Sequence, residues 1–180
     1  MKALVFDTET TGLVYNRIVK LEHQPEMVEW GSQLIDFDTG EIEDEYTTLI
    51  KPRHAITAFI TSKNKITNEM VDDAPYFEDV VERIITTINE APLVIAHNAA
   101  FDMEIVDIEL ERRDLGVMWP PAICSIEQTM HLKCKRLKNG ELYTLMTGNK
   151  MGRAHRAFDD VKALVASLVE LRKRGELPWL

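Results

Sequence analysis

Two carboxylates near the start of the chain have a spacing suited to shared chemistry. Asp7 and Glu9 lie in the segment Phe6-Asp7-Thr8-Glu9-Thr10-Thr11-Gly12, at the end of an apolar run. Residues two apart in a β-strand project to the same face, and two like charges that close repel unless a cation lies between them. Gly12 permits a turn, so the pair predicts a metal site at the carboxyl edge of a sheet. A solvated strand end is the simpler alternative.

A third carboxylate follows a second buried strand. The segment Ala96-His97-Asn98-Ala99-Ala100-Phe101-Asp102 comes directly after the apolar run Leu93-Val94-Ile95 and opens a helix. Asp102 then lies in the first helical turn, where the helix dipole favours a negative charge. That stabilisation alone would explain Asp102 without chemistry, and His97 is equally well explained as a structural histidine.

A histidine and a fourth acid occur together near the C-terminus. The segment Ala154-His155-Arg156-Ala157-Phe158-Asp159-Asp160 leads into an amphipathic helix, predicted from about Phe158 to Arg174. His155 lies five residues before Asp160, in the approach to the helix. A histidine placed beside a carboxylate metal site suits the role of general base.

Helical periodicity distinguishes the two adjacent acids at this helix start. Asp160 shares a stripe with Leu164 and Leu168, so we expect it to face the sheet. Asp159 shares its side with Ala163, and we expect that side to face solvent. The prediction is that Asp160 joins Asp7 and Glu9, whereas Asp159 stabilises the helix dipole at the surface.

Apolar patterns along the chain predict the strands and helices that position these residues. The predicted strands are Ala3–Asp7, Met27–Phe37, Glu43–Ile50, Leu93–Ala96 and Ala122–Ser125, with a hairpin turn at Asp38-Thr39-Gly40. The predicted helices are Thr67–Asp72, Phe77–Asn89, Ala100–Arg113 and Phe158–Arg174, with further helix after the fifth strand. Strands first and alternating strand–helix units later predict an α/β domain with a mixed sheet.

Length and composition restrict the class of protein. The 180 residues fit a single domain 1–180, with a core at 1–175 and a short apolar tail at 176–180. Two cysteines without a metal-binding spacing argue against a disulfide framework and favour a reducing, cytoplasmic location. No apolar run approaches the roughly 20 residues that cross a bilayer, and no signal peptide is apparent, so no membrane association is expected.

The net charge of −9 is unfavourable for binding a nucleic acid, because affinity for nucleic acid usually comes from contacts between basic side chains and phosphates. Bound cations would neutralise the four carboxylates and attract phosphate. The basic residues are also clustered, in a first group of Lys133, Lys135, Arg136 and Lys138 and a second group of Lys150, Arg153 and Arg156. The first group suits a solvated surface and a substrate contact equally well.

Taken together, the three segments resemble the DEDDh exonucleases, a family that includes the proofreading subunit of bacterial replicative polymerases. The patterns FDTETTG, HNAxFD and AHxAxxD occur in that order, and the run Val28-Glu29-Trp30-Gly31 is similar to the family's I-E-x-G. The resemblance covers nearly the whole chain. It implies a ribonuclease-H-like fold, with a central mixed five-stranded sheet flanked by helices, and 3′–5′ exonuclease activity that releases 5′-mononucleotides.

The resemblance also implies a role for each residue of the patterns. It makes Asp7, Glu9, Asp102 and Asp160 the ligands of two divalent cations, Mg²⁺ or Mn²⁺, and these hard cations suit oxygen-only ligands. It makes His155 the base that accepts a proton from the attacking water. The residues implied to bind the terminal nucleotide are Thr10, Thr11, Gly12, Leu13, Asn64 and Asn98. A buried strand end explains Leu13 equally well.

One segment departs from the family pattern. Many relatives carry His-Gly-Ile-Thr after the third strand, whereas this chain has Asn64-Lys65-Ile66-Thr67. Asn64 still offers hydrogen bonds and Lys65 adds a positive charge. We therefore expect altered selectivity for sugar or base with the same chemistry.

Three interpretations remain open at the level of substrate and partner. Single-stranded DNA with a free 3′ end is favoured, because the segments are most similar to the proofreading branch. An RNA-trimming or oligoribonucleotide exonuclease shares all five catalytic residues, and a non-catalytic polymerase accessory module would be expected to lack at least one. The apolar tail suits docking on a polymerase or sliding clamp, although packing against its own domain is the favoured interpretation.

Overall fold

The computed structural model describes residues 1–16, 18–152 and 155–177. The strands are β1 (Lys2–Thr10), β2 (Met27–Asp36), β3 (Glu41–Leu49), β4 (Val94–Ala96) and β5 (Ala122–Cys124). The helices are α1 (Ala58–Asn64), α2 (Asn68–Val71), α3 (Phe77–Glu90), α4 (Ala99–Glu111), α5 (Ser125–Thr129), α6 (Asn139–Thr147) and α7 (Ala157–Lys173), with 3₁₀ turns η1 (Leu21–His23) and η2 (Met130–Leu132). None of the described helices has the length and apolarity needed to cross a membrane.

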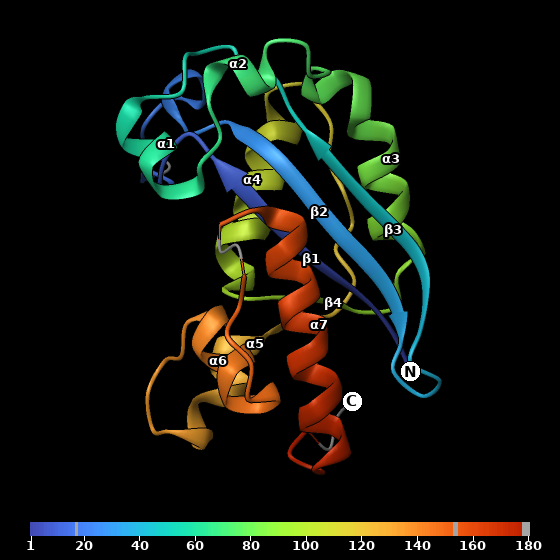
Figure 1. Ribbon diagram of the computed structural model, residues 1–180. Coiled ribbons are helices and arrows are strands. Elements are labelled where there is room, and N and C mark those ends of the chain that lie inside the picture. Colours follow the sequence, from blue (N-terminus) through green and yellow to red (C-terminus); the bar gives the residue numbers. More distant parts are fainter. Residues whose placement is uncertain (17, 153–154, 178–180) are drawn as a thin grey trace.

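The five strands form one mixed sheet in the order β3-β2-β1-β4-β5. The long strands β1, β2 and β3 pair antiparallel, and a hairpin at Gly40, whose φ of 78° suits glycine, joins β2 to β3. The short strands β4 and β5 add in parallel on the other side of β1. β1 is therefore the central strand (Figure 1). Its register with β4 puts Phe6 beside Ala96, where β4 ends and the chain leads into α4, so Asp7 to Thr10 extend beyond β4.

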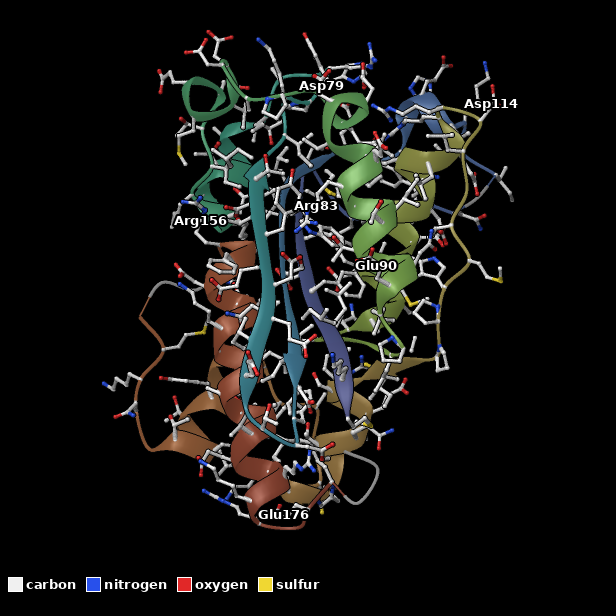
Figure 2. All side chains as sticks on the ribbon, turned by 90° about the vertical axis from the view of Figure 1, so that its right-hand side faces the viewer. Asp79, Arg83, Glu90, Asp114, Arg156 and Glu176 are labelled. Carbon is white, nitrogen blue, oxygen red and sulfur yellow. The ribbon has the colours of Figure 1, made fainter. Side chains whose placement is uncertain are left out.

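Helices cover both faces of the sheet, which explains why β1 is apolar on both sides. Leu4 and Phe6 pack with α3 and α4, and Phe6 stacks on Trp30 with ring centroids 5.3 Å apart. Ala3 and Val5 pack with α6 and α7 on the opposite face. Figure 2 shows α7 and α3 on the two sides of the sheet. By the same alternation, Asp7 and Glu9 face α7 and Thr8 faces α4.

The start of α7 approaches β2 unusually closely, and Gly31 makes this possible. Gly31 pairs with Asp7 across the sheet. A Cβ atom at Gly31 would lie 2.6 Å from the Phe158 nitrogen and 2.7 Å from the Ala157 carbonyl carbon. The missing side chain thus lets the helix that carries Asp160 pack directly on β2, beside the strand β1 that carries Asp7 and Glu9.

The predicted elements agree with the structure to within three residues at each end. Helix α1 was absent from the prediction, because it spans only seven residues and its start depends on one local contact, the Thr57 side chain accepting from the Ile60 N–H. The expectation that Ala163 faces solvent is wrong: α6 packs along α7 as a second neighbour and leaves Ala163 5% exposed.

The predicted tail is only partly described. Leu177 is 2% exposed and packs with the α7 side of the core, as expected for packing against its own domain. Pro178, Trp179 and Leu180 lie outside the described residues, as do Arg153 and Ala154 of the other predicted segments.

We predict that Gly31→Ala destabilises the protein by about 1–3 kcal/mol, because the new methyl group would overlap the α7 backbone. Gly116→Ala is a matched control, since no atom lies within 4 Å of its Cβ position, and it should change stability by less than about 0.5 kcal/mol. Urea unfolding of both variants measures the difference. Equal stabilities would contradict the close approach of α7 to β2.

Candidate active site

Three carboxylates from two elements meet at one point. One oxygen from each of Asp7, Glu9 and Asp160 lies within 4.8 Å of the others. β1 supplies the first two at adjacent same-face positions, and the first turn of α7 supplies the third. We call Asp7, Glu9 and Asp160 the acidic triad. The structure thus brings together the acids that helical phasing and strand alternation selected.

Asp102 approaches from the other side of β1. Its Oδ1 accepts hydrogen bonds from the Thr8 N–H at 3.0 Å and the Thr8 hydroxyl at 2.8 Å, and its side chain is buried. It therefore stands beside the acidic triad without belonging to it. All four acids line a cleft of about 470 Å³, together with His97, Asn98 and His155.

Asp160 also shapes the loop that carries His155. Its Oδ2 accepts the backbone N–H of His155 at 2.7 Å and that of Arg156 at 3.2 Å. These bonds hold His155 at a φ of 66°, a conformation that costs a non-glycine residue free energy. As predicted, His155 lies before the helix, and its side chain is exposed in the cleft. Asp159 instead pairs with Lys162 at 2.8 Å.

A buried ion pair that the residue patterns did not predict as functional fixes the start of α7. Glu29, 2% exposed, accepts the Arg156 guanidinium on both oxygens at 2.6 to 3.0 Å and the Ala157 N–H at 2.9 Å. Because Glu29 pairs with Glu9 across β1 and β2, the pair ties α7 to the strand beside the acidic triad. Figure 2 labels Arg156 at the start of α7. The sequence signal was the I-E-x-G run, which contains both Glu29 and Gly31.

His97 is fully hydrogen-bonded, in agreement with its structural interpretation. One ring nitrogen lies 2.8 Å from the Ser125 hydroxyl and the other 3.0 Å from the Leu137 carbonyl. Burial lowers the pKa of His97, which favours the neutral ring. The neighbouring Asn98 lines the cleft at a φ of 88° and starts α4.

The other residues predicted to bind the terminal nucleotide are dispersed. Thr11 and Gly12 line a separate hollow, and the Thr11 hydroxyl accepts the Glu26 N–H at 2.9 Å. The Thr10 hydroxyl donates to the Gly12 carbonyl at 2.6 Å, which holds the turn. Leu13 is 76% exposed, so its interpretation as a buried strand-end residue is wrong.

Asn64 lies next to the acidic triad. It is 2% exposed, donates to the Thr10 carbonyl at 3.4 Å, and its side chain also hydrogen-bonds to Glu9. The following Lys65 has a φ of 63°, in the region that glycine prefers. This conformation suits the glycine that the His-Gly-Ile-Thr pattern places where this chain has Lys65.

The electrostatics of the cleft favour a bound cation. Burial, followed by repulsion from Asp160, Glu29 and Asp102, raises the pKa of Glu9 to about 8. Burial and the same neighbours raise the pKa of Asp7 well above its usual range. Burial also raises the pKa of Asp102 to about 7, against the lowering effect of the Thr8 hydrogen bonds. A divalent cation would relieve this repulsion.

The donor set fits such a cation. The acidic triad offers only carboxylate oxygens, the ligands that hard divalent cations prefer. Arg156 is taken up by Glu29, and no lysine or arginine in the described ranges forms an ion pair with the triad. The site therefore has the ligands for a cation, and among the described residues no basic side chain contacts them.

Both the sequence and the structure are similar to known exonucleases. The exonuclease family model RNase_T matches residues 4–168. The DNA polymerase III PolC-type of Oceanobacillus iheyensis is 31% identical over 175 residues, which make up 95% of this chain and 11% of that protein. The chain thus spans about a tenth of the length of the curated relatives it matches.

Two solved structures share the architecture. The nuclease domain of 3′hExo, a DEDDh family member bound to rAMP, matches with a TM-score of 0.77 at 20% identity, over 97% of this chain and 92% of that one. Exonuclease X in complex with 5′ overhanging duplex DNA matches with a TM-score of 0.67 at 26% identity, over 96% and 93%.

The mixed sheet and its carboxylate cleft define a nuclease of ribonuclease-H-like fold. The chain belongs to the exonuclease family, as a 3′–5′ exonuclease of the DEDDh type. Enzymes of this type use divalent cations, in keeping with the oxygen-only donor set of this cleft.

We predict that Asp7→Asn stabilises the cation-free protein at pH 8. The raised carboxyl pKa values mean that the folded chain binds more protons than the unfolded chain between about pH 4 and 8, so stability falls as pH rises through this window. Removing one charge should raise the melting temperature in EDTA by roughly 2–4 °C for each kcal/mol of repulsion that is removed. It should also make the stability depend less on pH.

Asp73→Asn, at an exposed position, is the charge-matched control. It should change neither the melting temperature in EDTA nor its dependence on pH. Mg²⁺ should raise the melting temperature of the wild type and the control, and that of Asp7→Asn much less. A destabilised Asp7→Asn variant in EDTA would argue against repulsion at the triad. Differential scanning fluorimetry from pH 5 to pH 8 measures all three proteins.

Proposed function

We propose that the chain removes nucleotides one at a time from the 3′ end of single-stranded DNA, releasing 5′-mononucleotides. The observation that carries this proposal is the convergence of Asp7, Glu9 and Asp160 within 4.8 Å in a cleft also lined by Asp102 and His155. Four acids with so little neutralising charge suit cation-assisted phosphodiester hydrolysis better than binding alone.

In the proposed mechanism the four acids Asp7, Glu9, Asp102 and Asp160 hold two divalent cations, Mg²⁺ or Mn²⁺. When bound, these would stabilise the charge that develops on the attacking and leaving oxygens. Asp102 and Asp160 both raise the pKa of Asp7 and that of Glu9, so the two β1 acids lie between them. Asn64 and Thr8 orient Glu9 and Asp102 through their hydrogen bonds.

His155 accepts the proton of the attacking water in this mechanism. Its ring is exposed in the cleft, and its backbone is held by the Asp160 carboxylate. The Asp160 side chain thus serves as a cation ligand and also holds the backbone of the general base His155. The Glu29–Arg156 pair keeps this loop and α7 in register with β1 and β2.

DNA is the favoured substrate because the curated relatives are DNA polymerases of the PolC type and Exonuclease X was solved with DNA. The relatives also make a polymerase-associated proofreading role the favoured setting. RNA is the second candidate, supported by the rAMP bound to the 3′hExo nuclease domain. A non-catalytic module is disfavoured, since all four acids and His155 line one cleft.

The proposal predicts cation-dependent shortening of a 5′-labelled DNA strand from its 3′ end. Matched DNA and RNA oligonucleotides are incubated with Mg²⁺ or Mn²⁺, with and without EDTA, and resolved by length. DNA should be cleaved faster than RNA, and EDTA should abolish cleavage. Faster RNA cleavage would transfer the assignment to RNA, and cleavage of a circular strand or activity in EDTA would refute the mechanism.

We further predict that His155→Ala lowers kcat by about 10²–10⁴-fold, the usual effect of removing a general base. Strand binding and the stabilisation by Mg²⁺ should persist, because His155 contributes no carboxylate to the site. His131→Ala, another exposed histidine, lies outside the cleft and serves as control. Turnover within a few-fold of wild type in a folded His155→Ala protein would exclude this role.

A further inference from the structure

One wall of the acidic cleft is basic. Arg136 and Lys138 line the cleft beside Asn139 and Asp160, and both side chains are exposed. Within the part of the chain that the structure describes, neither side chain has a hydrogen-bond or ion-pair partner. The Lys138 charge interacts with Glu141 only at longer range. In a protein with a net charge of −9, two cations without a contacting acid at the catalytic cleft suit an anionic ligand.

The backbone aims these two side chains. Residues 136–138 connect η2 to α6, and Lys138 has an extended backbone with φ −73° and ψ 157°. Side chains alternate in extended backbone. Leu137 and Asn139, the first residue of α6, are buried, whereas Arg136 and Lys138 on either side of Leu137 are exposed and line the cleft.

The buried residues of this segment connect it to two of the three sequence patterns, HNAxFD and AHxAxxD. The Leu137 carbonyl accepts from His97, which precedes α4, at 3.0 Å. The Asn139 side-chain amide donates to the Asp160 carbonyl at 2.9 Å and to its carboxylate at 3.1 Å. We call residues 136–139 the basic rim. It has a fixed position relative to Asp102 on one side and Asp160 on the other.

The neighbouring basic residues are placed differently. Lys135 pairs with Glu141 at 3.0 Å, and Arg156 pairs with the buried Glu29 at 2.6 Å. Lys133 and Lys135 line a separate hollow of about 540 Å³. The structure therefore divides the first basic cluster into two cations at the cleft and two beyond it.

We propose that Arg136 and Lys138 bind successive phosphates of the nucleic-acid strand on the 5′ side of the scissile bond. The inference rests on the proposed function, which puts the terminal phosphodiester at the acidic triad. Phosphate contacts position a strand without reading its sequence. The two residues thus hold any strand end over the triad, and they compensate locally for the unfavourable net charge.

The test uses Arg136→Gln, Lys138→Gln, the double variant and Lys173→Gln as a charge-matched control. Lys173 lies thirteen residues beyond Asp160 on α7, about 20 Å along the helix. Binding of a fluorescent ten-nucleotide DNA strand is measured against salt, with Mg²⁺ and in a His155→Ala background that preserves the strand. Each lost contact should reduce the slope of log K against log salt by about 0.7, and the control should not change it.

A second measurement separates strand positioning from damage to the site. The p-nitrophenyl ester of thymidine 5′-monophosphate has a scissile phosphate and no upstream phosphodiester. The double variant should hydrolyse this ester with wild-type kcat/KM, while its kcat/KM on the ten-nucleotide strand falls roughly tenfold through KM.

Unchanged salt slopes, or equal losses on both substrates, would overturn the role of the basic rim. If the wild type hydrolyses neither substrate, the proposed function fails, and the salt slope of binding still decides whether the rim contacts phosphate. A wild type active on both substrates, together with variants impaired only on the strand, is the result that supports the inference.

Discussion

Repulsion among half-buried carboxylates is the constraint on which the rest of this structure depends. Asp7, Glu9 and Asp160 present oxygens within 4.8 Å of one another, and Asp102 stands close enough to raise the pKa of Asp7. If the backbone segments that carry these carboxylates were flexible, the repulsion would push the carboxylates apart. Each acid is accordingly attached to a rigid element or to a specific donor, and the rest of the fold can be understood as the framework for those attachments.

The attachments differ in kind. The central strand β1 holds Asp7 and Glu9 between two packed faces, with Phe6 stacked on Trp30 behind them. Hydrogen bonds from Thr8 hold Asp102, while backbone N–H groups hold Asp160. Part of the framework stability thus offsets the repulsion that the cation-free site contains, and a bound cation would relieve that repulsion.

The position of the start of α7 depends on two residues of β2, Gly31 and Glu29. Gly31 removes the steric obstacle to its approach, and Glu29 supplies the charge that binds Arg156 and the Ala157 N–H. Because the buried Glu29 binds the Arg156 guanidinium through both oxygens, the pair fixes the orientation of the start of α7 as well as its distance from β2. The same helix start carries Asp160 and the His155 loop, and through Asn139 it also positions the basic rim.

The sequence by itself determined the elements and the acids, because strand alternation and helical periodicity are local properties. Period two placed Asp7 beside Glu9, and period 3.6 placed Asp160 inward and Asp159 outward. The short helix α1 and the burial of Ala163 escaped these patterns, since the first depends on one capping contact and the second on a neighbouring helix. Only the tertiary structure could show that Glu29 binds Arg156, that Leu13 is exposed, and that Arg136 and Lys138 share the cleft with the acids. These facts depend on contacts between residues far apart in the chain, and no local periodicity encodes such contacts.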